Sequence, residues 1–512
     1  MKKYVALLAV SLMAIVVMGL LATDINAKEG ERVAMTNPGL NLEHPSVNSE
    51  WSKKFPRQYG SWKKTSESIE LEDMLKKWPA LAIVWAGYPF SKDYNAPRGH
   101  YYAVVDNTNT LRVAAPEINP ADPDSPLPAA CWTCKSPDVV RLMEDKGDLN
   151  YYTGKWNKWG TEVTSPIGCY DCHDKTDASL KMGRKYVNDG LKAAKLPEFK
   201  DSTHQVKRDL VCAQCHSEYY FHPTPNGEKT AMAVVFPWKN GLEPEGMLKY
   251  YDDPENFPNK QPFADFKNSI SGVPIIKAQH PDYELHTTGI HGKKGVSCAD
   301  CHMPYTQEGA TKFSDHQIQS PLKTMDRSCM TCHREDQDKL KAILKEKYDR
   351  KETLFKFAVN NLATAHLEMQ KARELGATDA ELASAVKLIR NGQWRWDYAV
   401  ASHGGFYHAP DETLFILSKA NQDAQAARVE LRAVLAKKGA ADFQAPDFST
   451  KEKAQAISFA ATKWPSYEKL AADKKKFKDE VVPKWLETAK ANGLLDPERP
   501  KDDRGAWFGH SK

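Results

Sequence analysis

Ten cysteines constrain this 512-residue chain more than any other feature, because all ten fall into five C-x-x-C pairs. The pairs are Cys131/Cys134, Cys169/Cys172, Cys212/Cys215, Cys298/Cys301 and Cys329/Cys332. Two thiols at this spacing can form thioethers with both vinyl groups of one porphyrin, and the next residue can then reach the iron. No cysteine is left over for a disulfide. The pattern therefore predicts five covalently attached haem c groups.

Four of the pairs continue directly into histidine, as CYDCH, CAQCH, CADCH and CMTCH. These motifs predict four axial haem ligands, namely His173, His216, His302 and His333. Structural zinc and redox-active dithiols are the alternatives, since zinc usually takes C-x-x-C pairs two at a time. An odd number of pairs does not fit that arrangement, and a histidine after four of the five favours haem.

The first pair reads CWTCK, so Lys135 stands where the other motifs have histidine. Lysine can bind iron only as a neutral amine, so coordination must displace a proton from a group whose ordinary pKa is about 10.4. An electron-transfer haem is usually ligated on both faces, whereas a catalytic haem keeps one position open. We therefore expect the chemically distinct Lys135 haem to be the site of reaction. The alternative is an exposed lysine beside a haem whose ligand comes from elsewhere.

The N-terminus has the pattern of an export signal over residues 1–27. Lys2 and Lys3 precede an apolar run from Val5 to Ala22, and a polar stretch ends at Ala27. The run is close to the length of about 18 residues at which an uncleaved membrane anchor becomes possible. A lipid anchor is excluded because the first cysteine is Cys131. Since haem c is assembled outside the cytoplasm, the chain is predicted to be periplasmic.

The composition of the chain changes near residue 335. Segments such as APEINPADPDSPLPAA and FHPTPNGEK interrupt residues 28–335, which indicates loops and short helices with few strands. Residues 336–512 have a helical character, which predicts a long-helix region whose apolar stripe packs against the haem body, the other helices or a second copy of the chain. The expected fold class is mainly α. The formal net charge of +4 is too small to indicate a nucleic acid or an anionic membrane as the partner.

Capping signals divide the long-helix region. From Arg334 to Leu375 there is no glycine or proline, and apolar residues recur at helical spacing. Gly376 is expected to end this helix, and Thr378 with Glu381 has the spacing of a capping box that starts the next. Further along, Gly439 is expected to end a third helix, and Ser449 with Glu452 to open a fourth.

Longer motifs add a resemblance to a known family. They are PRGHYY, TLRVAAP, CHSEYYF, KAQHPDYE, GIHGKKGVSC and QWRWDYAVASHG, together with the order of one C-x-x-C-K and four C-x-x-C-H motifs. Over nearly the whole mature chain, the sequence resembles pentahaem cytochrome c nitrite reductase, the ammonia-forming enzyme. The resemblance implies six-electron reduction of nitrite to ammonium at the Lys135 haem, with four bis-histidine haems relaying electrons. The alternatives are a multihaem electron-transfer cytochrome and a hydroxylamine-converting multihaem enzyme.

The resemblance also implies the distal haem ligands. His100 would complete the Cys212/Cys215 haem, His316 the Cys169/Cys172 haem and His291 the Cys329/Cys332 haem. His408, from the long-helix region, would complete the Cys298/Cys301 haem, with His403 as the less favoured choice. Taken alone, each of these histidines would be interpreted as a surface or capping residue.

By the same resemblance, Arg112, Tyr219 and His280 line the open side of the Lys135 haem. Nitrite is a small anion that a guanidinium can hold, histidine can deliver protons, and tyrosine can donate hydrogen bonds to bound nitrogen oxides. A haem propionate is the alternative partner of Arg112. A calcium site is implied next to this pocket, formed by Glu218, the carbonyls of Tyr219 and Lys277, and the Gln279 side chain. All are oxygen donors, as a hard cation requires.

The implied partners are a second copy of the chain and an electron donor. The family pairs through its long C-terminal helices, so a homodimer is expected. The donor would be either a membrane quinol-oxidising tetrahaem cytochrome or a soluble multihaem cytochrome, since both need only an exposed haem edge. The sequence does not rank nitrite above hydroxylamine or sulfite as the physiological substrate.

Overall fold

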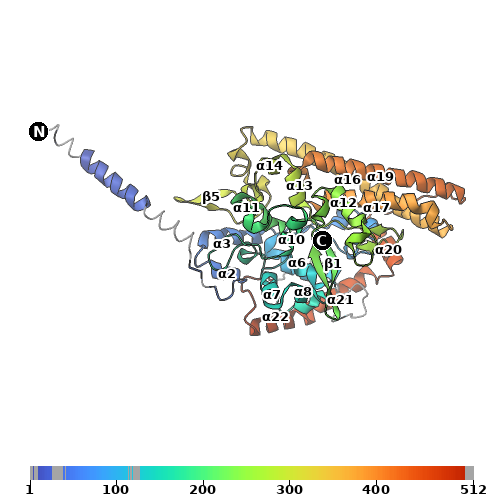
Figure 1. The fold of residues 1–512 in the computed structure, drawn as a ribbon, viewed down its shortest axis with the longest axis horizontal. Helices are drawn as coiled ribbons and strands as arrows, with labels where there is room; N and C mark the ends of the chain where they lie inside the picture. The colour runs from blue at the N-terminus through green and yellow to red at the C-terminus, as the bar shows by residue number, and fades with distance from the viewer. Residues whose placement is uncertain are drawn as a thin grey trace.

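The computed structural model describes residues 4, 10–25, 39–40, 42–113, 115, 118 and 127–501. Over these residues the chain forms a helical body with three two-stranded sheets, and long C-terminal helices lie along one side of it (Figure 1). This arrangement confirms the predicted fold class, which is mainly α with few strands.

The helices of the body are short, because proline, glycine and the attachment motifs repeatedly interrupt the chain. They are α2 (Asn48–Trp51), α3 (Pro56–Lys63), α4 (Met74–Lys77), α5 (Leu81–Val84), α6 (Ala103–Asn109), α7 (Asp138–Lys146), α8 (Asp148–Tyr152), α9 (Cys169–Cys172), α10 (Tyr186–Ala193), α11 (His204–Ala213), α12 (Pro244–Asp252), α13 (Asp282–Thr288), α14 (Ile290–Lys293) and α15 (Cys298–His302). Two attachment motifs form helices of their own, α9 and α15. A third motif begins in the last turn of α11.

Three antiparallel hairpins supply the strands. They are β1 (Tyr220–Asn226) with β2 (Lys229–Val235), β3 (Phe266–Lys267) with β4 (Pro274–Ile275), and β5 (Tyr305–Glu308) with β6 (Thr311–Ser314). In the first hairpin Tyr220 lies opposite Val235, and Gly227 takes a positive φ of 60° in the tight turn. Because β1 starts immediately after Tyr219, this hairpin fixes one side of the predicted pocket.

The long helix α16 (Gln337–Glu374) has 38 residues, which gives a length of about 57 Å at 1.5 Å per residue. Asp336 caps its first turn by accepting from the Asp338 N–H at 2.8 Å. Gly376 follows the helix with a φ of 80°, a conformation that favours glycine. The predicted end of this helix is therefore confirmed.

The next helix, α17 (Asp379–Ala401), begins at the predicted capping box. The Thr378 hydroxyl accepts from the Glu381 N–H at 3.3 Å, and the Glu381 carboxylate accepts from the Thr378 N–H at 2.8 Å. The short α18 (Gly405–His408) leads into α19 (Pro410–Lys437), and Gly439 follows α19 with a φ of 80°.

The predicted start of the following helix is wrong by one residue. Thr450, not Ser449, caps α20 (Lys451–Thr462), because the Thr450 hydroxyl accepts from the Lys453 N–H at 3.4 Å. The Ser449 N–H instead donates to the Asp447 carboxylate at 2.8 Å. Ser449 therefore belongs to the preceding turn.

The C-terminal helices pack in two groups. In the first, α16, α17 and α19 lie side by side (Figure 1) and bury Met369, Ile389 and Leu431 in one cluster. In the second, α20, α21 (Tyr467–Glu480) and α22 (Val482–Ala491) return to the body. There Phe459 and Leu470 pack against Leu111. The second group therefore supports the chain next to Arg112.

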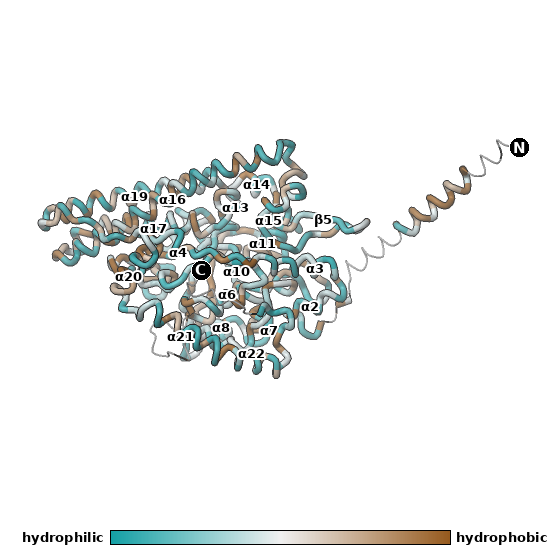
Figure 2. Tube along the Cα trace, turned by 180° about the vertical axis from the view of Figure 1, so that it is seen from behind, coloured by the Kyte–Doolittle hydropathy of each residue, from teal (hydrophilic) through white to brown (hydrophobic). Residues whose placement is uncertain are grey.

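The N-terminal segment lies apart from this body. Residues 10–25 are helical and exposed, and they project away from the rest of the chain as a mainly hydrophobic segment (Figure 2). The predicted cleavage point at Ala27 falls outside the described residues. Among the helices that the structure describes, none is both long enough and apolar enough to span a bilayer.

Candidate functional site

The five cysteine pairs lie close to one another in the body. The thiols of Cys134 and Cys215 interact directly, and so do those of Cys212 and Cys298. Cys301 in turn is near Cys329. Attachment motifs that are far apart in the sequence are therefore brought together, so that groups attached there would be close neighbours.

Cys332 differs from the other predicted attachment residues, because it is exposed whereas the other nine cysteines are partly buried. It follows a 3₁₀ turn over Cys329–Thr331, a few residues before α16 begins. The next residue, His333, is also well exposed, with 42% of its side chain accessible. The structure thus does not enclose this thiol as it does the others. The attachment of haem at Cys332 remains a prediction that rests on the C-x-x-C-H spacing.

Among the described residues, five pairs of histidine rings have centroids no more than 6.3 Å apart. One is His286 with His408 at 5.8 Å, which contains no motif histidine, and the other four each contain one. The ring centroids are 6.3 Å apart for His100 and His216, His173 and His316, and His302 and His408, and 6.1 Å apart for His291 and His333. An imidazole nitrogen binds a metal at about 2 Å and lies about 1 Å from its own ring centre, so two imidazoles on opposite sides of one metal have centroids about 6 Å apart. Each of these four pairs contains one motif histidine and the distal residue that the family resemblance implied for it. The spacing fits one iron between the two rings.

The distal rings are neutral at neutral pH, as metal ligation requires. Burial lowers the pKa of His100, His316 and His408 to about 4 in each case. Backbone carbonyls orient several of the rings, since His173 Nδ1 lies 2.7 Å from the Ala178 oxygen and His302 Nδ1 lies 2.9 Å from the Gln319 oxygen. These contacts leave Nε2 as the nitrogen available to a metal.

Lys135 follows a rigid turn that carries its two cysteines. Cys131 lies on a 3₁₀ turn over Ala129–Trp132, and the Lys135 N–H donates to the Trp132 oxygen at 2.9 Å. The buried Trp132 ring stacks on Trp156 with centroids 4.8 Å apart and an interplanar angle of 14°. The Trp132 indole N–H also donates to the Trp156 oxygen at 2.8 Å. The position of Lys135 is therefore set by a packed aromatic base.

The predicted pocket residues gather around the same motif. Arg112 is close to Cys131, and its guanidinium lies over the Phe90 ring at 4.3 Å, with Nε donating to the Thr110 hydroxyl at 3.1 Å. The Tyr219 and His280 rings are 6.2 Å apart.

The electrostatics of His280 fit this placement. Burial, with a smaller contribution from nearby Lys135, lowers the pKa of the His280 imidazole well below its usual range. His280 is therefore neutral at neutral pH, with one ring N–H that can donate a hydrogen bond.

The segment that leads to His280 is held by three carboxylates, of which those of Glu218 and Asp397 are buried and that of Asp265 is partly buried. Asp265 accepts from the Lys277 N–H at 2.7 Å, Asp397 accepts from the Ala278 N–H, and Glu218 accepts from the Gln279 N–H at 2.6 Å. The carboxylates come from the residue before β3, from α17 and from the chain before β1. Three consecutive backbone N–H groups are thus fixed from three directions, which preorganises the loop that ends at His280.

The proposed calcium residues lie in this acidic cluster. Burial raises the pKa of Glu218 well above its usual range, that of Asp265 to about 7 and that of the neighbouring Glu284 to about 8. The Lys277 carbonyl accepts from the Gln279 amide nitrogen at 3.0 Å, so the amide must turn over to offer its oxygen to a cation. Several buried carboxyl groups beside a carbonyl fit a hard divalent cation, which would offset the cost of their ionisation.

Three further residues of the site were not predicted from the sequence. Asp265 and Asp397 fix the loop before His280, and Asp282 lies 3.7 Å from the ring nitrogens of both His216 and His408. Asp282 and Asp397 occur within the KAQHPDYE and QWRWDYAVASHG motifs, but an acidic residue in a motif gives no sign of its burial. Only their position between segments distant in sequence indicates their role.

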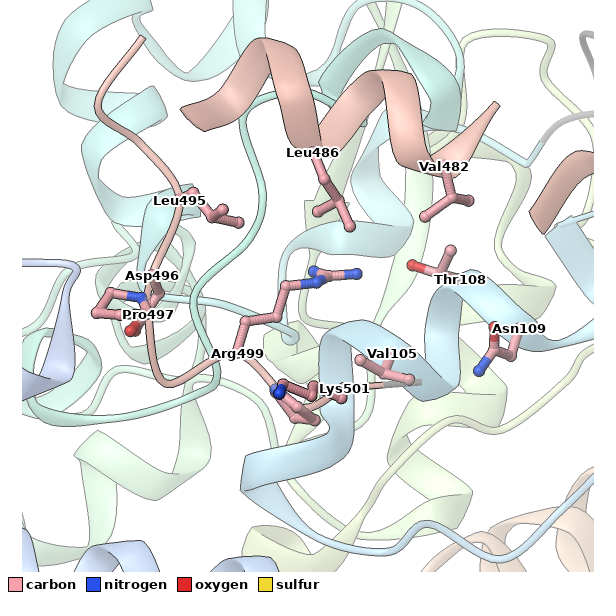
Figure 3. Close-up of a pocket in the computed structure, with 11 residues that line it drawn as sticks. Val105, Thr108, Asn109, Val482, Leu486, Leu495, Asp496, Pro497, Arg499 and Lys501 are labelled. Atoms are coloured by element: carbon pink, nitrogen blue, oxygen red, sulfur yellow. The ribbon is translucent and has the colours of Figure 1, made fainter. Parts of the chain in front are cut away.

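A separate pocket lies away from these residues. It has a volume of about 370 Å³ and lies between α6 and the C-terminal segment, where Val482 and Leu486 of α22 face Val105 and Thr108 of α6 (Figure 3). None of the predicted site residues lines it. Its shape therefore adds nothing to the chemistry around Lys135.

Known proteins show strong similarity to the chain. A family model described as cytochrome c552 matches residues 48–497. Proteins named cytochrome c-552 from Maridesulfovibrio salexigens and Desulfotalea psychrophila are 48% and 47% identical to it over 97% of this chain and 97% and 96% of their own length. The solved cytochrome c nitrite reductase from Desulfovibrio desulfuricans, described as a catalytic subunit with two calcium sites, superposes with a TM-score of 0.67 at 29% identity. That match covers 89% of this chain and 97% of the solved chain.

Proposed function

Because this chain belongs to the cytochrome c552 family, we propose that it is a pentahaem cytochrome c nitrite reductase that converts nitrite to ammonium at the haem of Cys131 and Cys134. Membership confirms the resemblance seen in the sequence motifs. The reaction takes six electrons and eight protons per nitrite and yields ammonium and two waters.

One observation carries the proposal more than any other. The four histidine pairs at 6.1–6.3 Å supply two ligands for each of four motifs. The remaining motif has Lys135 in the ligand position and Arg112, Tyr219 and His280 around it. A site with one unusual ligand and a polar, proton-donating surround is what a substrate-binding haem requires.

The residues of the pocket have distinct roles in this proposal. The haem, when bound, supplies electrons and the position that nitrite occupies. Arg112 offers a permanent positive charge to the anion, and its stacking on Phe90 and bond to Thr110 keep the guanidinium in place. His280 and Tyr219 present N–H and O–H donors to the nitrogen oxide, so that protons enter next to the reacting atoms.

The other four motifs serve electron transfer. His100 and His216, His173 and His316, His291 and His333, and His302 and His408 are proposed as the axial ligand pairs. The His302–His408 spacing favours His408 over His403 as the distal ligand. The contacts from Cys134 to Cys215 and from Cys212 to Cys298, with Cys301 near Cys329, support a continuous path to the Lys135 haem.

Calcium is proposed to organise the loop that presents His280. Glu218, the carbonyls of Tyr219 and Lys277, and the Gln279 side chain would bind it. The buried carboxyl groups around Glu218 support a cation here. The role is structural, because the cation would lie behind the reacting groups.

We also propose a homodimer formed through the long-helix region, residues 336–512, against a catalytic body of residues 28–335. Phe357 on α16 is 59% exposed, and Phe415 and Val429 on α19 are 55% and 71% exposed. Large apolar side chains on neighbouring helices support an interface between copies. A monomer in light scattering at micromolar concentration would contradict this assembly.

The location is proposed to be the periplasm, reached through the signal of residues 1–27. There a membrane quinol-oxidising tetrahaem cytochrome or a soluble multihaem cytochrome would supply electrons. Determination of the N-terminus of the exported protein tests the predicted cleavage, and an intact N-terminus would indicate an uncleaved anchor instead.

The experiment that separates an enzyme from an electron-transfer cytochrome is ligand binding to the isolated holoprotein. We expect a high-spin haem signal in electron paramagnetic resonance that changes when nitrite or cyanide is added, alongside low-spin signals that do not. A fully low-spin spectrum that is insensitive to both anions would show that all five haems are closed, and the proposed activity would be wrong.

A further inference from the structure

One carboxylate lies between ligands of two different haems. Asp282, at the start of α13, has Oδ2 at 3.7 Å from His216 Nδ1 and Oδ1 at 3.7 Å from His408 Nδ1. His216 belongs to the Cys212/Cys215 motif, and His408 faces His302 of the Cys298/Cys301 motif. A single negative charge is therefore close to the outer ring nitrogens of two proposed ligands.

Asp282 is held in this position by its own backbone and by the segment that follows α17. The Ser402 hydroxyl donates to Oδ1 at 2.6 Å and the Gly404 N–H donates to the same oxygen at 3.4 Å. Its own N–H donates to the His280 oxygen at 2.7 Å, and the next residue, Tyr283, donates its N–H to the His216 oxygen at 2.9 Å. The carboxylate is thus tied to the loop of the catalytic pocket and to a haem attachment motif.

Other proposed ligands have different partners at the outer nitrogen. The Nδ1 atoms of His173, His302 and His316 face the backbone oxygens of Ala178, Gln319 and Ser314 at 2.7–2.9 Å. His333 faces the Glu335 carboxylate at 3.5 Å, but that pair is exposed, with side-chain exposures of 42% and 46%. Asp282 is only 13% exposed. The His216 ring is itself 54% exposed and the His408 ring 22%, so the two sites are distinguished from His333 by the lower exposure of their shared carboxylate.

The charge of a partner at the outer nitrogen tunes the metal. A carboxylate makes the imidazole a stronger electron donor, which stabilises the ferric state over the ferrous state. Each haem couple takes one electron, Fe(III) to Fe(II), so stabilisation of Fe(III) lowers its reduction potential. The effect is larger where solvent screens it less.

We propose that Asp282 sets the reduction potentials of two haems together, those of Cys212/Cys215 and of Cys298/Cys301. This inference rests on the haem ligation proposed above and not on the identity of the substrate. Asp282 is a positioning and tuning residue, because it acts through His216 and His408. Because one charge acts on ligands of both haems, it shifts both potentials in the same direction relative to the Lys135 haem.

The test is a spectroscopic redox titration of the holoprotein with a dithionite and ferricyanide couple, comparing wild type with Asp282→Asn. We expect two low-spin haems to become easier to reduce, each by at least tenfold in its equilibrium constant, which corresponds to about 59 mV for a one-electron couple. Asp282→Glu keeps the charge and should leave both potentials near the wild-type values. Intact mass and low-spin resonance signals check that all haems are attached and doubly ligated in each variant.

Glu335→Gln provides the matched control, since it also removes a carboxylate 3.5 Å from a proposed ligand ring. Because this pair is exposed, we expect a smaller shift, confined to one haem. Unchanged potentials in Asp282→Asn, a shift in only one haem, or equal shifts in Asp282→Asn and Asp282→Glu would each overturn the proposal. Loss of the low-spin signals from wild type would instead contradict the proposed ligation itself.

Discussion

Asp397 Oδ1 lies 2.8 Å from Lys277 Nζ, and both side chains are almost completely buried, at 0% and 5% exposure. The Trp85 indole N–H donates to the second Asp397 oxygen at 3.3 Å, and the Lys277 ammonium lies over the Trp85 ring at 4.9 Å. This ion pair joins α17 to the loop that carries Gln279 and His280. A residue of the long-helix region therefore helps to position the catalytic pocket.

Asp397→Asn should loosen that loop. The substitution leaves the Lys277 ammonium buried without a charged partner, a change that typically costs about 3–5 kcal/mol. We expect calcium affinity to fall by about 10- to 100-fold, as for other residues that support a metal ligand. Nitrite turnover should fall with it and recover partly in excess calcium. Calcium titration of chelator-treated holoprotein by isothermal calorimetry measures the effect.

Asp252→Asn is the control for Asp397→Asn. Asp252, in α12, forms an ion pair at 3.0 Å with Arg390 of α17, the helix that also carries Asp397. The Asp252 side chain is 40% exposed. A partly exposed pair contributes about 1 kcal/mol or less, so this variant should keep wild-type calcium affinity. Equal losses in both variants would mean that general destabilisation of α17, not the Lys277 contact, explains the effect.

Lys135→His tests the unusual ligand. Both thioether cysteines remain, so the intact mass should still include five haems. Turnover should decrease, because imidazole changes the ligand field and must fit against the Trp132 turn. Wild-type activity together with an unaltered high-spin resonance signal would show that Lys135 does not bind the iron.

His280→Ala should give a different defect. The haem spectra should remain nearly unchanged, while nitrite turnover should fall by a factor on the order of 10²–10⁴ if the imidazole is a positioned proton donor. His204→Ala, a variant of a histidine at the exposed start of α11, serves as the control and should retain activity. A high-spin signal that grows in His280→Ala while a low-spin signal disappears would assign His280 to the iron instead of to proton delivery.

His366 provides a pH-dependent test of the helical region. Its Nδ1 accepts from the Ser271 hydroxyl and its Nε2 donates to the Gln393 side chain, both at 2.7 Å. Burial lowers the pKa of His366 to about 4, although the bond to Gln393 opposes the shift. The unfolded chain, with a pKa of about 6.5, therefore binds the proton first as the pH falls. Stability should be complete above pH 6.5 and decline between pH 6.5 and 4.

The expected loss from this one histidine is about 2 kcal/mol between pH 7 and pH 5. This loss is measured by comparing the denaturation midpoints of wild type and His366→Gln at each pH. The contributions of the other titrating groups are the same in both proteins and cancel in the difference. The variant should be less stable at pH 7 but less sensitive to acid. Parallel pH profiles would contradict the assignment.

The sequence predicted the parts of the molecule that depend on local signals. C-x-x-C spacing indicates haem attachment at residues such as Cys169 and Cys172, and Gly376 and Thr378 mark helix ends because the backbone chemistry there is local. The start of α20 was wrong by one residue, because Ser449 and Thr450 are both competent caps and only the turn at Asp447 decides between them.

The surroundings of an attachment cysteine could not be predicted from its motif. CMTCH has the same spacing as the other three histidine motifs, yet Cys332 is exposed and Cys172 is partly buried. Exposure depends on which segments pack over each motif, and the five-residue pattern carries no information about them.

The positions of the carboxylates around the site are a second feature that local signals do not indicate. Asp265 contacts Lys277, 12 positions away, whereas Asp282 contacts His216, 66 positions away, and Asp397 contacts Lys277, 120 positions away. Their roles therefore depend on tertiary packing. Pairing of His302 with His408 similarly depends on how α18 meets α15, and only the family resemblance indicated it.

The stoichiometry of nitrite reduction tests the central claim most directly. The holoprotein is mixed with limiting nitrite and an excess of reduced viologen, and both viologen oxidation and ammonium are measured. We predict six electrons consumed and one ammonium formed for each nitrite. One electron per nitrite with release of nitric oxide, or no consumption of nitrite, would contradict the assignment of the Lys135 haem as an ammonia-forming site.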